Sequence, residues 1–195
     1  MNKTTKLTLL TISSLLLTLT SLSKTTFGQE KPLDNPDKSI NKAKEINPNI
    51  VANAGLSKSS KLYAIRLKPG QDIKLTIENF AKENSIKAGF IVTAVGSLQS
   101  ATIRLADQKD PSSFNEKMEI VSLVGTISLD GVHFHISLAD KTGKTFGGHM
   151  SDGCKVYTTA EIIIGSLDDI VFSREQDPQT GFRELIINPT SEQKK

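Results

Sequence analysis

The centre of the chain reads GVHFHISLAD over residues 131–140, and TFGGH follows over residues 145–149. Apolar side chains alternate through the first segment, which is typical of a β-strand with one face toward a core. The intervening KTGK, over residues 141–144, has the composition of a hairpin turn. The sequence therefore predicts two antiparallel strands, the second folding back on the first.

All three histidines of the chain lie in this hairpin. His133 and His135 are two residues apart, so their side chains leave the strand on the same face. The return strand brings His149 alongside, and the two glycines before it allow a close backbone approach. Three imidazoles with no fourth protein ligand in view are typical of a metal site with an open position. The alternative is that the histidines serve packing alone.

A divalent metal ion is therefore the expected cofactor. Zinc is the ion expected first for three imidazole ligands, although iron, nickel, cobalt and copper accept the same ligands.

The N-terminal residues have the pattern of a secretory signal. Lys3 and Lys6 precede an apolar segment over residues 7–19 that is short and rich in Thr and Ser, and small residues follow. We expect a signal peptide over residues 1–28, cleaved between Ser23 and Gly28, and a protein exported to the periplasm or secreted. No stable membrane span would remain after cleavage. The alternative is an uncleaved N-terminal anchor helix.

The charge balance argues against broad binding to nucleic acid. The chain has 24 basic and 21 acidic residues, and three of the lysines and none of the acids lie in residues 1–28. The remainder carries equal numbers of the two signs, so it lacks the positive field on which non-specific nucleic-acid binding depends.

The rest of the chain divides into a polar linker over residues 29–60, a folded domain over residues 61–189 and a tail over residues 190–195. Asp72 is placed to cap a helix whose apolar residues begin at Ile73. The remaining segments predict an α+β fold, a largely antiparallel sheet with one principal helix packed on it. Strands are expected over residues 62–67, 90–98, 101–106, 119–129, 131–140, 155–164, 168–174 and 182–187, and a loop at residues 110–113.

Two further features follow from these segments. Residues 90–95 and 162–164 are apolar on both faces, so both faces of the sheet need cover, one from the helix and the other from a partner chain. The single cysteine, Cys154, cannot form an internal disulfide, and we expect it to be buried.

Seven motifs recur in the order of a known family. Together they resemble the PPC domain, a module shared by plants and prokaryotes, over about residues 62–188. The resemblance implies a compact α+β domain that assembles as a homotrimer. It also implies that His133, His135 and His149 are metal ligands, as in many prokaryotic members. The motifs are LKPGQD (67–72), AGFI (88–91), GSL (96–98), GTI (125–127), HFHISLAD (133–140), GGHM (147–150) and CKVYTTAEI (154–162).

The same resemblance carries a DNA-binding label. Plant members join the domain to AT-hook segments that enter the DNA minor groove, and prokaryotic members are often named accordingly. This chain has no Arg-Gly-Arg-Pro segment and carries the predicted export signal. DNA binding remains one alternative. Another is an interaction module with a structural metal, in which Asp140 or Asp152 supplies a fourth ligand.

The architecture and histidine pattern also resemble those of acetolactate decarboxylase, a zinc enzyme acting on a small 2-hydroxy-3-keto acid. This resemblance implies a metal-dependent, lyase-like reaction or small-molecule binding. Glu161 is then the candidate acid–base group, because it stands among apolar residues where an unpaired carboxylate is costly to bury. Its alternative is an ion pair with Arg66 or Arg104. Arg66 is the candidate for holding a substrate carboxylate, and its alternative is an ordinary surface position.

Overall fold

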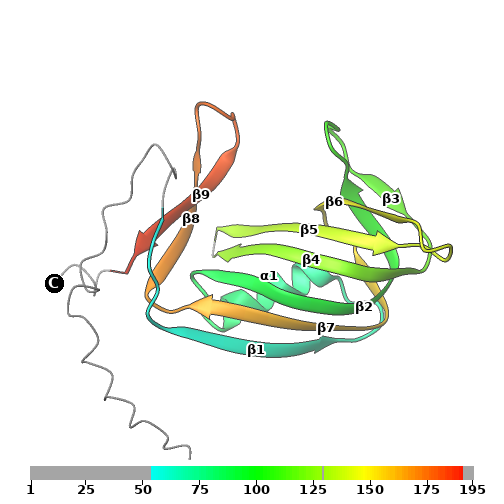
Figure 1. Cartoon of the computed structure of the whole chain (residues 1–195), viewed down its shortest axis with the longest axis horizontal. Coiled ribbons are helices and arrows are strands. Elements are labelled where there is room, and N and C mark those ends of the chain that lie inside the picture. The colour runs from blue at the N-terminus through cyan, green and yellow to red at the C-terminus, as the bar shows by residue number, and fades with distance from the viewer. Residues whose placement is uncertain (1–53, 129, 191–195) are drawn as a thin grey trace, which may run out of the picture. The chain divides into compact units, whose positions relative to one another are not determined.

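The computed structural model describes residues 54–128 and 130–190. The predicted signal peptide, residues 29–53 of the predicted linker and residues 191–195 of the predicted tail lie outside this range. The elements are one helix and nine strands (Figure 1): β1 (Ser60–Leu67), α1 (Ile73–Glu83), β2 (Gly89–Arg104), β3 (Ser112–Phe114), β4 (Met118–Ser128), β5 (Gly131–Ala139), β6 (Thr145–Met150), β7 (Lys155–Leu167), β8 (Ile170–Gln176) and β9 (Arg183–Pro189). The α+β class with a largely antiparallel sheet is confirmed.

The main sheet runs in the order β1-β7-β2-β4-β5-β6, with β3 paired to β2. All its pairings are antiparallel. The end of β2 also pairs with β6, where Ile103 lies opposite Met150 and Arg104 opposite His149. Because β2 pairs with both β4 and β6, the strands β2, β4, β5 and β6 close into a ring. The sheet therefore closes toward a barrel, and the histidine hairpin β5–β6 supplies two strands of the closed part.

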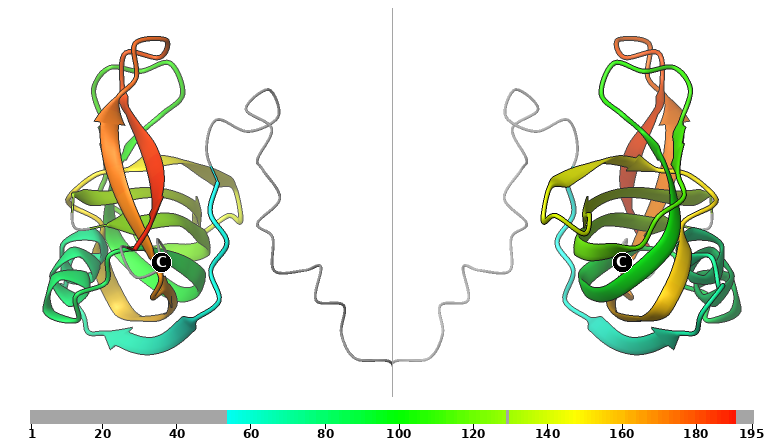
Figure 2. Two further views of the ribbon diagram at one scale, coloured as in Figure 1. Left: turned by 90° about the vertical axis from the view of Figure 1, so that its left-hand side faces the viewer. Right: turned by 90° about the vertical axis from the view of Figure 1, so that its right-hand side faces the viewer.

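The helix covers one face of the sheet, as the side views in Figure 2 show. It begins where predicted, because the Asp72 carboxylate accepts a hydrogen bond from the Leu75 amide at 3.1 Å. The buried side chains Ile73, Ile77 and Ala81 lie at helical spacing and pack into the core formed by the inner face of the strands. Helix α1 is too short and insufficiently apolar to span a membrane, and it is the only helix among the residues described.

One core holds these layers together. It contains Phe134, Ile136 and Leu138 from β5. Apolar residues from β1, β2, β4, β6 and β7 complete it. Cys154 belongs to this core and is fully buried, as predicted. Burial raises the pKa of its thiol to about 11, so the group stays protonated at neutral pH.

The structure corrects the prediction for β2. Residues 90–98 and 101–106 were expected to form two strands. They instead form one strand of 16 residues whose register against β7 shifts between Gly96 and Leu98 and again between Leu98 and Ser100. These irregularities bend the strand without ending it, and the bend lets its last residues reach β6.

Strands β8 and β9 form a separate hairpin with its own small core. Ile170 and Phe172 are buried there against Ala88 at the start of the β2 region. The tip of the hairpin extends beyond the main sheet (Figure 1), on the side where the histidine strands lie.

Candidate metal centre

Strand β5 presents its histidines on the face away from the core. Phe134 and Ile136 are buried, whereas His133 and His135 are exposed, so the strand alternates as the sequence predicts. His149 of β6 lies directly opposite His135. Side chains paired in this way point to the same face of a sheet, so pairing and alternation together bring the three imidazoles onto one surface.

The three rings converge. Their centroids lie 5.1 Å (His133–His135), 5.1 Å (His133–His149) and 5.6 Å (His135–His149) apart. One ring nitrogen from each residue lies within 4.8 Å of the other two. The Nε2 atoms of His133 and His135 are 3.2 Å apart.

These distances fit a single tetrahedral ion. Metal–nitrogen bonds of ~2.0–2.1 Å place two ligand nitrogens ~3.3 Å apart, close to the separation of the two Nε2 atoms. The Nδ1 atom of His149 is buried and has no hydrogen-bond partner among the described residues. An unpaired buried nitrogen is costly, and binding a cation at the cluster would give the ring a defined ligand role. The residues present therefore suit a divalent metal.

The electrostatic surroundings of His133 and His149 favour the neutral imidazole, the form that binds metals. Burial and the charges of His133 and Arg104 lower the pKa of His149 to about 4. Burial, Arg174 and His135 lower the pKa of His133 below its ordinary value. Both rings are therefore unprotonated at neutral pH, which removes the proton competition that weakens histidine sites.

The depressed pKa of His149 should make the stability of the protein depend on pH once a chelator has removed any bound metal. In the unfolded chain the imidazole has a pKa of about 6.5, so between that pH and about 4 the unfolded state binds more protons. The free energy of unfolding should then fall as pH drops through this window. Urea melts at pH 7.5, 5.5 and 4.5 should show a smaller fall for His149→Gln. Parallel profiles for the two proteins would contradict the assignment.

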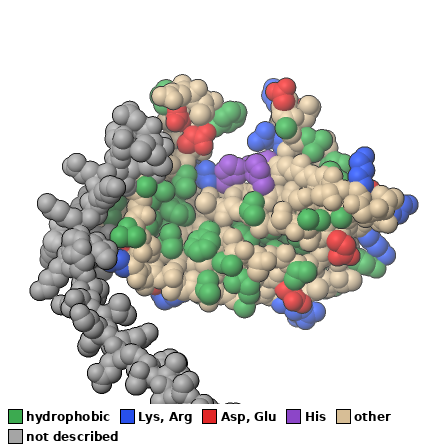
Figure 3. All heavy atoms as spheres, in the orientation of Figure 1, with side chains coloured by type: hydrophobic (Ala, Val, Ile, Leu, Met, Phe, Trp, Pro, Cys, Tyr) green, Lys and Arg blue, Asp and Glu red, His purple; other side chains and the backbone are tan. Residues whose placement is uncertain are grey.

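The histidines form the floor of a cavity of about 470 Å³. In Figure 3 their side chains lie in a saddle between the β8–β9 hairpin and the region where β2 leads into β3. Sequence reasoning missed the other lining residues, which are Arg104 at the end of β2 and Phe182, Arg183 and Glu184 at the tip of the hairpin. Arg104 lies directly opposite His149. The two residues become neighbours only because β2 pairs with β6, which the sequence does not indicate.

Arg174 fixes the hairpin beside the histidines. Its Nη2 atom donates a hydrogen bond to the Thr126 hydroxyl at 2.9 Å, and Thr126 lies directly opposite His133. The Arg174 backbone carbonyl in turn accepts from Nε and Nη2 of Arg183 at 3.2 and 2.6 Å. The cavity wall is thus tied to β4, the strand paired with the one that carries two of the histidines.

The glycine before His149 is required by the closure of the ring. A Cβ atom at Gly148 would lie 2.6 Å from the Arg104 carbonyl oxygen and 3.0 Å from Cγ2 of Ile103. The expectation that a glycine here permits close backbone approach is confirmed, and the neighbouring backbone belongs to β2.

Glu161 and Arg66 lie elsewhere. The structure places them directly opposite each other on β7 and β1, both exposed and neither lining the histidine cavity. The expectation that Glu161 is buried among apolar residues is wrong, because Ala160 and Ile162 face the core and Glu161 takes the outward position between them. Arg66 Nε donates to the Thr159 hydroxyl at 3.0 Å. Their catalytic roles stay predictions.

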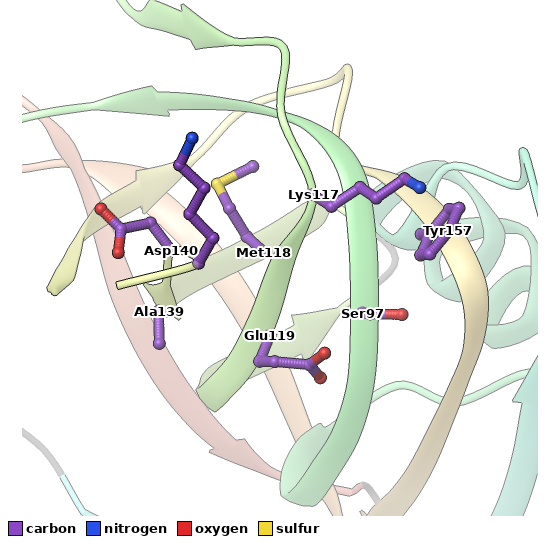
Figure 4. Close-up of a pocket in the computed structure, with 8 residues that line it drawn as sticks. Ser97, Lys117, Met118, Glu119, Ala139, Asp140 and Tyr157 are labelled. Atoms are coloured by element: carbon purple, nitrogen blue, oxygen red, sulfur yellow. The ribbon is translucent and has the colours of Figure 1, made fainter. Parts of the chain in front are cut away.

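The two aspartates considered as fourth ligands have other partners. Asp140 accepts bonds from the amide and hydroxyl of Thr142 and from the amide of Lys144 in the β5–β6 turn. Asp140 lines a second, smaller cavity of about 230 Å³, together with Lys117 and Tyr157 (Figure 4). Asp152 pairs with Lys74 at 2.6 Å. Neither aspartate belongs to the histidine group.

The chain matches a known domain family and is similar to part of a curated protein. Residues 55–168 match the Plants and Prokaryotes Conserved (PCC) domain. The chain is also similar to a protein of Synechococcus sp. (strain JA-2-3B'a(2-13)) named Bifunctional protein GlmU, with 47% identity over 133 residues. That alignment covers 68% of this chain and 21% of the relative, so the chain spans about a fifth of the curated protein's length.

Three solved structures share the fold. A hypothetical protein from Salmonella enterica is 37% identical with a TM-score of 0.68, covering 70% of this chain and 98% of its own. A metal-containing protein from Archaeoglobus fulgidus is 30% identical with a TM-score of 0.62, covering 69% and 99%. A candidate DNA-binding protein from Bacteroides thetaiotaomicron is 25% identical with a TM-score of 0.58, covering 67% and 96%.

Proposed function

The chain belongs to the Plants and Prokaryotes Conserved domain family, and from this membership we propose that it is a metal-binding member whose open metal position receives a small molecule. The observation that carries the proposal is the convergence of His133, His135 and His149 within one cavity. The metal-containing relative from Archaeoglobus fulgidus gives independent support.

Zinc is the proposed ion, because three neutral imidazoles with one open position form its usual catalytic set. When bound, such an ion supplies Lewis acidity and lowers the pKa of a coordinated water. Among the chain's own residues, His149 stays unprotonated because its pKa is low, and Arg104 and Arg183 bring positive charge to the cavity. A lyase-like reaction, by likeness to acetolactate decarboxylase, is one form this function takes.

Metal content tests the proposal. The purified protein, loaded with zinc and then gel-filtered, should retain about one ion per chain by elemental analysis, as expected for one site of three imidazoles. Retention far below one ion per chain would refute it. A band shift with DNA at physiological salt, together with absent metal, would instead favour the DNA-binding alternative.

We also propose assembly as a homotrimer through the sheet face that α1 does not cover. This face exposes apolar side chains along several strands, and Figure 3 shows hydrophobic atoms spread over it. Exposed apolar surface of this kind favours a protein partner, and copies of the chain are the partner that family membership supports. Light scattering should give about three times the chain mass. The residues are Leu62, Val92, Val95, Val121 and Val124.

Export to the periplasm or the exterior remains part of the proposal. It depends on residues 1–28, which lie outside the described part of the chain.

A further inference from the structure

The histidine cavity carries more positive charge than its acids balance. Arg104 lines one side, Arg183 lines the other, and Glu184 is the one carboxylate among the described lining residues. The ion pairs that join described residues include neither arginine. Arg174 adds a further charge behind the hairpin, where it borders His133 through Thr126.

Both guanidinium groups retain free donors. Arg104 makes one long contact, from Nη1 to the Gln108 carbonyl oxygen at 3.5 Å. Arg183 is held by two donations to the Arg174 carbonyl, which leave its Nη1 without a partner among the described residues. A guanidinium has five N–H groups in a planar fork that matches the oxygens of carboxylates and phosphates.

The two arginines approach the histidines from different elements. Arg104 stands beside His149 in the cross-strand row, and Arg183 comes from the hairpin tip. A ligand between them would lie directly over the imidazole cluster. The cavity volume of about 470 Å³ suits a small molecule.

The geometry points to Arg104 and Arg183 as an anion clamp, which binds the carboxylate or phosphate group of a small ligand while another oxygen of that ligand approaches the metal. This inference rests on the proposed metal site and adds the substrate class, a small oxyanion. Glu184 opposes the anion, but two arginines and a divalent cation leave the cavity positive.

The test uses the full chain loaded with cobalt, whose visible spectrum reports changes in coordination. The probes are oxalate, inorganic phosphate and, as a neutral oxygen donor, ethylene glycol. Oxalate or phosphate should shift the spectrum saturably, and ethylene glycol at equal concentration should not. Whichever of the two anions saturates at lower concentration identifies the preferred group.

Variants assign the effect to the arginines. Arg104→Gln and Arg183→Gln should each raise the apparent Kd for the preferred anion by about tenfold or more, since each removes charged hydrogen bonds. Cobalt stoichiometry should stay unchanged, which also shows that the variants fold. Lys82→Gln is the charge-matched control, because Lys82 is exposed on α1 and outside the cavity. It should bind like the wild type.

The outcomes separate the two proposals. If cobalt binds but the anions have no saturable effect, or have equal Kd in all variants, the clamp is overturned and the metal site stands. If cobalt does not bind, the metal function fails, and calorimetry with phosphate on the metal-free protein decides the clamp. A heat of phosphate binding that is present in the wild type and lost in Arg183→Gln supports the clamp. The absence of any binding heat in the wild type overturns it.

Discussion

Replacing His133 by alanine is expected to weaken zinc binding by at least about a hundredfold, since even removing a residue that merely supports a metal ligand costs 10–100-fold. His133 Nε2 lies 3.2 Å from His135 Nε2, one edge of the proposed tetrahedron. The variant leaves two imidazoles and two open positions. Competition with a chromophoric chelator, at a pH where the wild type holds one ion per chain, measures the change.

The control for this variant is Ser137→Ala. Ser137 follows His135 by two residues on the same face of β5 and lies outside the histidine group. It should keep wild-type affinity, and the His133→Ala protein should keep its fold because the side chain is exposed. Equal zinc affinity in His133→Ala and wild type would remove His133 from the site.

The largest expected effect on stability belongs to Gly125→Ala. Gly125 has φ +146°, and a Cβ there would meet the backbone carbonyl of His133 and lie 2.7 Å from Cδ1 of Phe134. The neighbours are backbone and a fully buried ring, so they cannot move cheaply. We expect a loss of about 3 kcal/mol or more, seen as a melting temperature lower by roughly 10 °C.

Gly143→Ala separates the strain of the backbone from the clash. Gly143 also has positive φ (+82°), but no atom lies within 4 Å of the position that a Cβ would take there. The cost there should be about 1 kcal/mol, from φ alone. If thermal melts give the two variants the same loss, packing of β4 against β5 at Gly125 is not the cause.

The hairpin that carries the histidines was predictable because its signals are local. Alternation fixed the outward face of His133 and His135, and the turn after Asp140 fixed the return strand. Asp72 likewise predicted the helix start. Each of these depends on residues a few positions apart, where periodicity and capping are informative.

The cavity walls were not predictable, because they depend on contacts far apart in sequence. Arg104 reaches His149 only after the irregular register of β2 carries the strand across to β6. Arg183 reaches the site because the β8–β9 hairpin is held against the sheet, by Arg174 on Thr126 and by the Phe172 amide on the Lys87 carbonyl. The burial of Glu161 was mispredicted for a different reason. When the neighbours of a carboxylate along a strand are all apolar, the sequence does not show which face of the sheet the carboxylate occupies.

The most direct measurement is a crystal structure of the zinc-loaded protein with anomalous data at the zinc edge. The account predicts one peak per chain at the meeting point of His133, His135 and His149, with nitrogen distances of ~2.0–2.1 Å and a non-protein atom in the fourth position. A map with no peak there, or a peak closed by a fourth protein ligand, would contradict it.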